Sequence, residues 1–209
     1  MLADTNERPG IEEQYQTAGN TSDLTVDAER RGAGDVLIAA GWSDSRMGMA
    51  LLRLHSEWDA AAKPRRMTDA QVRQLAATIP DARGKPNMSR ARSEAIVWYA
   101  RELRLLATSL KSRSGVLQQI HAWALLKGIS ADYVGPALFH WLSPVCPVCD
   151  GHGLRKVPDQ PALSGKRCHA CGGSGKSARP EGSTRIQNHL DYCVTVARHS
   201  LKARLRREG

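Results

Sequence analysis

Two short cysteine and glycine units constrain the fold of this chain more than any other feature of its sequence. Each unit follows the pattern CxxCxGxG, first over residues 146–153 and again over residues 168–175. Two intervening residues let a pair of thiolates face one ion, and the glycines permit positive φ angles that turn N–H groups toward sulfur. The paired units therefore predict one structural zinc ion, bound by Cys146, Cys149, Cys168 and Cys171.

The context of the cysteines favours a metal site over disulfides. Eighteen residues separate Cys149 from Cys168, a comfortable length for a hairpin. No basic and then apolar leader opens the chain, so we expect a cytoplasmic protein, in which paired cysteines are typical metal ligands. Four thiolates leave no open coordination position, which indicates a structural rather than a catalytic ion. The fifth cysteine, Cys193, lies on an apolar helical stripe, and we expect it in the core.

Helical periodicity dominates the remainder of the 209 residues. Thr68 and Gln71 have the spacing of a capping box, and Pro80 ends the helix that follows. Runs of β-branched residues are scarce, and no apolar segment is long enough to cross a membrane. We predict a mainly α fold, a helical bundle with an inserted four-cysteine zinc-knuckle hairpin and a long C-terminal helix. The expected parts are an acidic, mostly disordered leader (1–33), a helical body (34–145), the zinc-binding module (146–176) and a basic C-terminal helix (177–209).

The charge of the chain suggests a nucleic-acid partner. The net charge is +9, but residues 1–40 carry −5 and the remaining residues carry +14. Between the cysteine units, the basic pairs Arg155-Lys156 and Lys166-Arg167 flank the expected hairpin symmetrically. We predict that these four side chains contact DNA phosphates, with a solvated hairpin edge as the alternative.

Residues 115–142 form a candidate helix-turn-helix. Gly128 follows Ala124 by four positions, so a small residue and a turn glycine lie where two helices approach. In this interpretation Ser130 caps the second helix and Tyr133 faces the DNA bases. Pro136 lies inside that second helix, which equally favours a helical hairpin belonging to the core, so both interpretations stay open.

The cysteine units and their flanks resemble the lambda-type Q late-gene antitermination proteins of bacteriophages. The similar segments are GDVLIAAG at 34–41, RMGMALL at 46–52 and Ala-Asp-Tyr at 131–133, followed by the two CxxCxGxG units joined by a basic loop. The resemblance covers roughly residues 34–175, with the paired units as its specific element.

The resemblance implies a transcription antiterminator that works in the cytoplasm of a host bacterium. Such proteins bind double-stranded DNA near a late promoter, join paused RNA polymerase and make it read through terminators. The four cysteines match the metal ligands of the family, and the four basic loop residues fall in the region that the family uses near DNA. Neither a membrane nor a small-molecule substrate is expected as a partner.

Two other classes of function compete with this one. A zinc-containing DNA-binding regulator needs the same features without travelling with polymerase. A chaperone-like module is the other, because CxxCxGxG also marks the cysteine-rich region of DnaJ co-chaperones, although those carry four units and a His-Pro-Asp tripeptide that this chain lacks. We do not expect an enzyme, since the sequence shows no nucleophile elbow, phosphate-binding loop or open metal site.

Overall fold

The computed structural model describes residues 10–22, 32–41, 45–156 and 162–207. The described residues are mainly helical and end in a long C-terminal helix, which confirms the predicted fold class. The elements, in chain order, are α1 (Ile11–Asn20), α2 (Ala33–Gly41), α3 (Arg46–Ala60), α4 (Asp69–Thr78), α5 (Met88–Ser109), α6 (Arg113–Leu126), a 3-10 turn η1 (Ala131–Tyr133), α7 (Val134–Leu142), β1 (Leu154–Lys156), β2 (Leu163–Arg167) and α8 (Thr184–Arg207).

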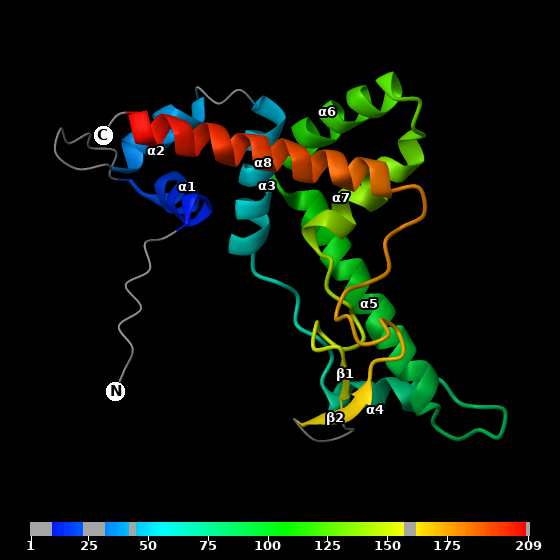
Figure 1. The fold of residues 1–209 in the computed structure, drawn as a ribbon. Coiled ribbons are helices and arrows are strands. Elements are labelled where there is room, and N and C mark those ends of the chain that lie inside the picture. The colour runs from blue at the N-terminus through cyan, green and yellow to red at the C-terminus, as the bar shows by residue number, and fades with distance from the viewer. Residues whose placement is uncertain (1–9, 23–31, 42–44, 157–161, 208–209) are drawn as a thin grey trace, which may run out of the picture.

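Helix α8 is the central element of the body. It packs against α1, α2, α3 and α7, so segments that are far apart in the sequence meet along one helix (Figure 1). Its buried stripe recurs at helical spacing, as the sequence predicts. Cys193 is part of this stripe and is 7% exposed, which confirms its predicted place in the core. The other buried residues of the stripe are Ile186, Leu190, Val194, Ala197, Leu201 and Leu205.

A glycine allows α3 and α8 to cross closely. A Cβ atom on Gly48 would collide with the Cys193 carbonyl oxygen and would lie 2.7 Å from the Ala197 Cβ. Ser45 caps α3 by accepting a hydrogen bond from the Gly48 N–H at 3.0 Å, and its hydroxyl donates to the Cys193 carbonyl at 3.2 Å. The two backbones therefore approach to a distance that no larger residue at position 48 permits.

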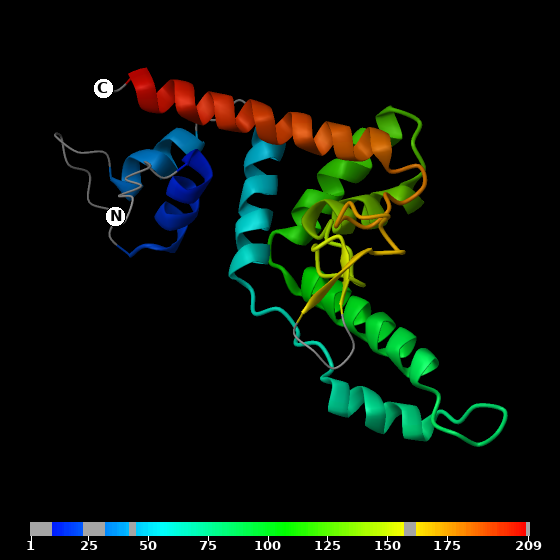
Figure 2. The same ribbon diagram turned by 60° about the horizontal axis from the view of Figure 1, so that its bottom comes forward.

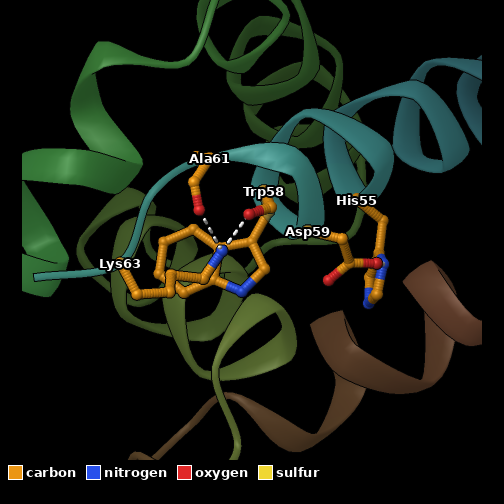
Figure 3. A network of polar contacts seen from close by, with 5 residues as sticks. All are labelled: His55, Trp58, Asp59, Ala61 and Lys63. Carbon is orange, nitrogen blue, oxygen red and sulfur yellow. Dashed lines mark hydrogen bonds and ion pairs between the residues drawn. The ribbon is translucent and has the colours of Figure 1, made fainter. Parts of the chain in front are cut away.

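The end of α3 is closed by a lysine from the segment that follows it (Figure 3). The Lys63 ammonium donates hydrogen bonds to the carbonyl oxygens of Trp58 and Ala61 and lies 4.2 Å from the centroid of the Trp58 ring. Burial lowers the pKa of Lys63, and the nearby Asp59 carboxylate opposes that shift. One turn earlier His55 Nδ1 lies 2.8 Å from the Asp59 carboxylate. A cation thus satisfies the carbonyl end of the helix, where the helix dipole is negative.

The prediction of a mostly disordered leader is wrong for residues 11–20. These residues form α1, which packs against α2 and α8 and buries Ala18. The Glu13 carboxylate accepts a hydrogen bond from the Gly10 N–H at 3.2 Å and so closes the start of the helix. Residues 1–9 and 23–31 lie outside the described part of the chain. Sequence periodicity missed α1 because a helix with few apolar residues depends on packing against its neighbours.

Helices α4 and α5 form an arm with its own small core. Both views show α4 and the adjoining part of α5 extending away from α8 (Figures 1 and 2). The predicted capping box is confirmed, because Thr68 Oγ1 accepts from the Gln71 N–H while the Gln71 side chain accepts from the Thr68 N–H. The α5 cap is Asn87, which accepts from the Arg90 N–H at 3.0 Å. The core of the arm consists of Val72, Ala76 and Ala91, with Met67, Leu75, Met88 and Ala95 packed against it.

Residues 113–142 form a helical hairpin that packs into the main core. Gly128 has φ 63°, and the Ile129 N–H donates to the Ala124 carbonyl at 2.9 Å, which ends α6 in the manner that the sequence suggests. Pro136 falls in the first turn of α7, where a missing N–H costs no helix hydrogen bond. The side chains that α7 buries in the main core are Val134, Ala137, Leu138 and Leu142.

Candidate metal centre and basic hairpin

The four predicted ligands converge at one point. The Sγ atoms of Cys146, Cys149, Cys168 and Cys171 all lie within 4.8 Å of one another. The Sγ atoms of Cys149 and Cys171 are 3.7 Å apart, far beyond a disulfide bond and close to the edge of about 3.8 Å that four sulfurs form around a tetrahedral zinc ion. Three of the four residues are buried, at 1% exposure each. The cluster could therefore bind a metal ion such as zinc.

The two cysteine units are joined by a pair of equivalent backbone hydrogen bonds. The Cys146 N–H donates to the Gly175 carbonyl at 2.8 Å, and the Cys168 N–H donates to the Gly153 carbonyl at 2.7 Å. Within each unit the last glycine N–H donates to the second sulfur, Gly153 to Cys149 and Gly175 to Cys171, both at 3.3 Å. These N–H donors stabilise thiolate charge, as the spacing of the glycines predicts.

The last glycine of each unit is required by its backbone conformation and by lack of space. Gly153 and Gly175 have φ of 71° and 72°, in the left-handed region that glycine adopts without strain. A Cβ on Gly153 would collide with the Gly173 carbonyl, and a Cβ on Gly175 would collide with the Gly151 carbonyl. The twin motif thus encodes two knuckles that fit closely around one set of four sulfurs.

Two of the thiols have strongly shifted acidities. Burial raises the pKa of the Cys149 thiol to about 11. Burial acts in the same direction on Cys171, but the N–H groups of Gly173 and Gly175 and hydrogen bonds from neighbouring thiols lower its pKa to about 6. A bound cation favours the thiolate form of all four cysteines, because a thiol that coordinates a metal ion gives up its proton.

The segment between the knuckles forms the predicted hairpin. Strands β1 and β2 pair antiparallel, with Leu154 opposite Arg167, and the Arg155 Nε donates to the Arg167 carbonyl at 3.2 Å. The side chains of Arg155, Lys166 and Arg167 are exposed. Lys156 lies in β1, but its side chain and loop residues 157–161 are outside the described part of the chain. The hairpin therefore presents at least three basic side chains to solvent beside the four-cysteine cluster.

The entry and exit of the four-cysteine module are joined to the helical body. Val145 and Lys176 form an antiparallel bridge, and the Ser177 N–H donates to the Pro144 carbonyl at 2.8 Å. His140 on α7 lies between the module and α8, with Nε2 3.2 Å from the Ser177 carbonyl and Nδ1 2.9 Å from the Gln187 amide nitrogen. We call these paired segments, residues 144–145 and 176–177, the stem of the module. The stem fixes the orientation of the module on the body.

An arginine also ties the module to the arm, and no local sequence pattern reveals it. Arg66, in the segment between α3 and α4, pairs with the Asp150 carboxylate in the first knuckle. Its guanidinium lies 4.2 Å from the centroid of the Tyr99 ring on α5. Asp150 has φ 53°, at the place where the second unit has Gly172 with φ 62°. The Arg66 side chain therefore connects the four-cysteine module, the linker between α3 and α4, and the arm.

We expect Arg66→Ala to lower the free energy of unfolding by about 1–2 kcal/mol, because it removes a half-buried ion pair together with a cation–π contact. A double-mutant cycle with Asp150→Asn, followed by urea unfolding, measures the coupling between the two side chains. The matched control is Arg65→Ala at the exposed neighbouring position, for which we expect a change within about 0.5 kcal/mol. A coupling free energy near zero would contradict an ion pair between Arg66 and Asp150 that stabilises the fold.

The other predicted DNA-contacting residues, Ser130 and Tyr133, lie away from the hairpin. They flank or belong to η1, at the opposite end of α7 from Cys146, and α7 alone rises about 13 Å. Ser130 Oγ accepts from the Asp132 N–H at 3.3 Å. The Tyr133 ring packs against Gly182, where a Cβ would lie 2.8 Å from ring atoms. A DNA role for these two residues stays a prediction.

Comparisons with known proteins place the chain in no family: no protein-family model, no curated protein and no solved structure matches it. Among the described residues, no helix combines the length and the apolar character needed to cross a membrane. What the chain does must therefore be argued from the four-cysteine cluster and the surfaces around it.

Proposed function

We propose that this protein is a zinc-stabilised factor that binds double-stranded DNA and acts as a transcription antiterminator of the phage late-gene type. The exposed basic hairpin between the knuckles of the four-cysteine cluster carries the DNA-binding part of this proposal. The antitermination part rests on the sequence resemblance of residues 34–175. Zinc fits the donor set, because four sulfurs at tetrahedral spacing are typical of structural zinc sites. The ion would have no open position for a substrate, so its role is to hold the hairpin in shape.

Charge supports DNA as the partner of the hairpin. Arg155, Lys166 and Arg167 offer guanidinium and ammonium groups that suit phosphate oxygens. The arm and its linker add to this field, since residues 61–109 carry ten bases and four acids. Cationic surface of this kind supplies salt-dependent affinity for nucleic acid.

The DNA prediction can be tested on the hairpin itself. We expect Arg155→Gln combined with Lys166→Gln to weaken duplex DNA binding about tenfold at low salt and to reduce the salt-dependence slope by about 2. Fluorescence anisotropy over a salt series measures both quantities. Lys111→Gln combined with Lys202→Gln removes the same charge from two exposed positions outside the hairpin, one in the turn after α5 and one on α8, and is expected to change the slope less. Equal slopes for the two double variants would exclude the hairpin as the DNA surface.

Antitermination is tested separately from DNA binding. Purified bacterial RNA polymerase transcribes a template that carries the protein's late promoter upstream of an intrinsic terminator, and the fraction of read-through transcripts is measured. We expect read-through with the zinc-loaded protein and none with Cys168→Ser. DNA binding without read-through would indicate a plain DNA-binding regulator. Suppressed aggregation of an unfolded client without DNA binding would instead support the chaperone-like class.

A further inference from the structure

A groove opens between the helical body and the stem of the four-cysteine module. It has a volume of about 620 Å³, within the range of ligand and peptide pockets. Its lining comes from helix α5, the start of α6, helix α7 and the chain that enters and leaves the module. The groove is therefore assembled from the module and the body together.

The walls of the groove are largely apolar and partly exposed to water. Leu103 on α5 and Phe139 on α7 are partly buried, and both contribute to the lining. Val145, on the module stem, is 50% exposed although it directly precedes the first cysteine ligand. Apolar surface that lines a concave site and stays accessible is typical of a binding site.

Positive charge accompanies this apolar surface. Arg104 and Arg113 both line the groove, and none of its described lining residues is acidic. The Arg104 guanidinium lies 5.7 Å from the centroid of the Phe139 ring, so charge and apolar surface are adjacent. A ligand that fits must bring an apolar group with negative charge beside it.

We propose that this groove binds a peptide segment of a partner protein in which an aromatic or aliphatic side chain is flanked by aspartate or glutamate. The apolar side chain enters between Leu103, Phe139 and Val145, and the carboxylates face Arg104 and Arg113. A concave apolar wall suits a side-chain anchor better than a sugar-phosphate backbone, which favours protein over nucleic acid here. The groove is separate from the basic hairpin, and the proposal holds whether or not the protein acts in transcription.

The first test selects ligands without assuming the partner. A library of random short peptides displayed on phage is selected against the zinc-loaded full-length protein and, in parallel, against Ala178→Trp. Ala178 is exposed and lines the groove, so an indole there fills the site without disturbing the core. We expect wild type alone to enrich sequences that combine an apolar anchor with neighbouring carboxylates. Basic sequences, no enrichment, or the same sequences on both proteins would overturn the proposal.

The second test measures the charge requirement with the best selected peptide. Fluorescence anisotropy is expected to show about tenfold weaker binding to Arg104→Glu than to wild type. Arg101→Glu is the matched control, because Arg101 is exposed on the same helix but does not line the groove. Equal losses in the two variants would reduce the effect to net charge and overturn the proposal. A further outcome would also overturn the proposal: a short DNA duplex displaces the peptide, and Arg104→Glu, but not Arg101→Glu, weakens binding of that duplex.

Discussion

Cys168→Ser is expected to abolish metal binding and to unfold residues 146–176, while most of the helical body stays folded. The module's own core consists of the cysteines and Val148, which is too small to hold a fold without a metal ion. The body has a separate core built on α3, α6, α7 and α8. Loss of one thiolate therefore removes the folding free energy of the module and leaves the main core in place.

Elemental analysis and hydrogen exchange measure this outcome together. Wild type should contain one zinc equivalent per chain and should protect the amides of Gly153 and Gly175, which donate to sulfur. The variant should contain no metal and lose that protection, while α8 amides remain protected. Cys193→Ala is the matched control, because it removes a cysteine from the core of the body and should keep the full metal content. A Cys168→Ser protein that retained its zinc would contradict the four-thiolate site.

Gly48→Ala is expected to be the most damaging single-methyl change in the helical body. The added Cβ would collide with the backbone of α8 at Cys193, so the two helices must move apart or tilt. Separating them exposes the apolar stripe of α8, and we expect the free energy of unfolding to fall by about 3 kcal/mol. Helix propensity alone predicts the opposite, a gain in the free energy of unfolding, because alanine favours helix more than glycine does.

Urea unfolding followed by circular dichroism measures the effect of Gly48→Ala. Gly115→Ala provides the matched control, because nothing lies within 4 Å of a Cβ built at Gly115 in α6. That substitution should leave stability unchanged or raise it by about 0.5–1 kcal/mol. If both variants had the same stability as wild type, the close crossing of α3 and α8 would be wrong.

Local sequence rules predict the four-cysteine cluster and many helix boundaries because they act over a few residues. The convergence of the four cysteines follows from two repeated units, and the capping box at Thr68 follows from one spacing. The hairpin between the knuckles is confirmed for the same reason, since paired knuckles oblige the chain to turn between them. The apolar stripe of α8 follows from its period alone.

The features that the sequence does not reveal are set by distant partners. Nothing in the sequence around Gly48 indicates that α8 crosses α3 at this glycine. Nothing around Arg66 distinguishes it from the other arginines, because its partner Asp150 is far away in the sequence. Helix α1 is stable where α2 and α8 cover it, so its own composition gives little signal. The groove is missed because its walls come from three separate stretches of the chain.

The reach of α8 has a consequence for the order in which a ribosome can complete this protein. Ser45 and Cys193 are in contact although 148 positions separate them in the sequence, so α3 can pack against α8 only after the intervening chain has been made. The arm closes over a much shorter span and can form while α8 is still being translated. Until α8 emerges, the apolar surfaces that α3 and α7 turn toward α8 stay exposed to water, and exposed apolar surface makes a partly synthesised chain prone to aggregate.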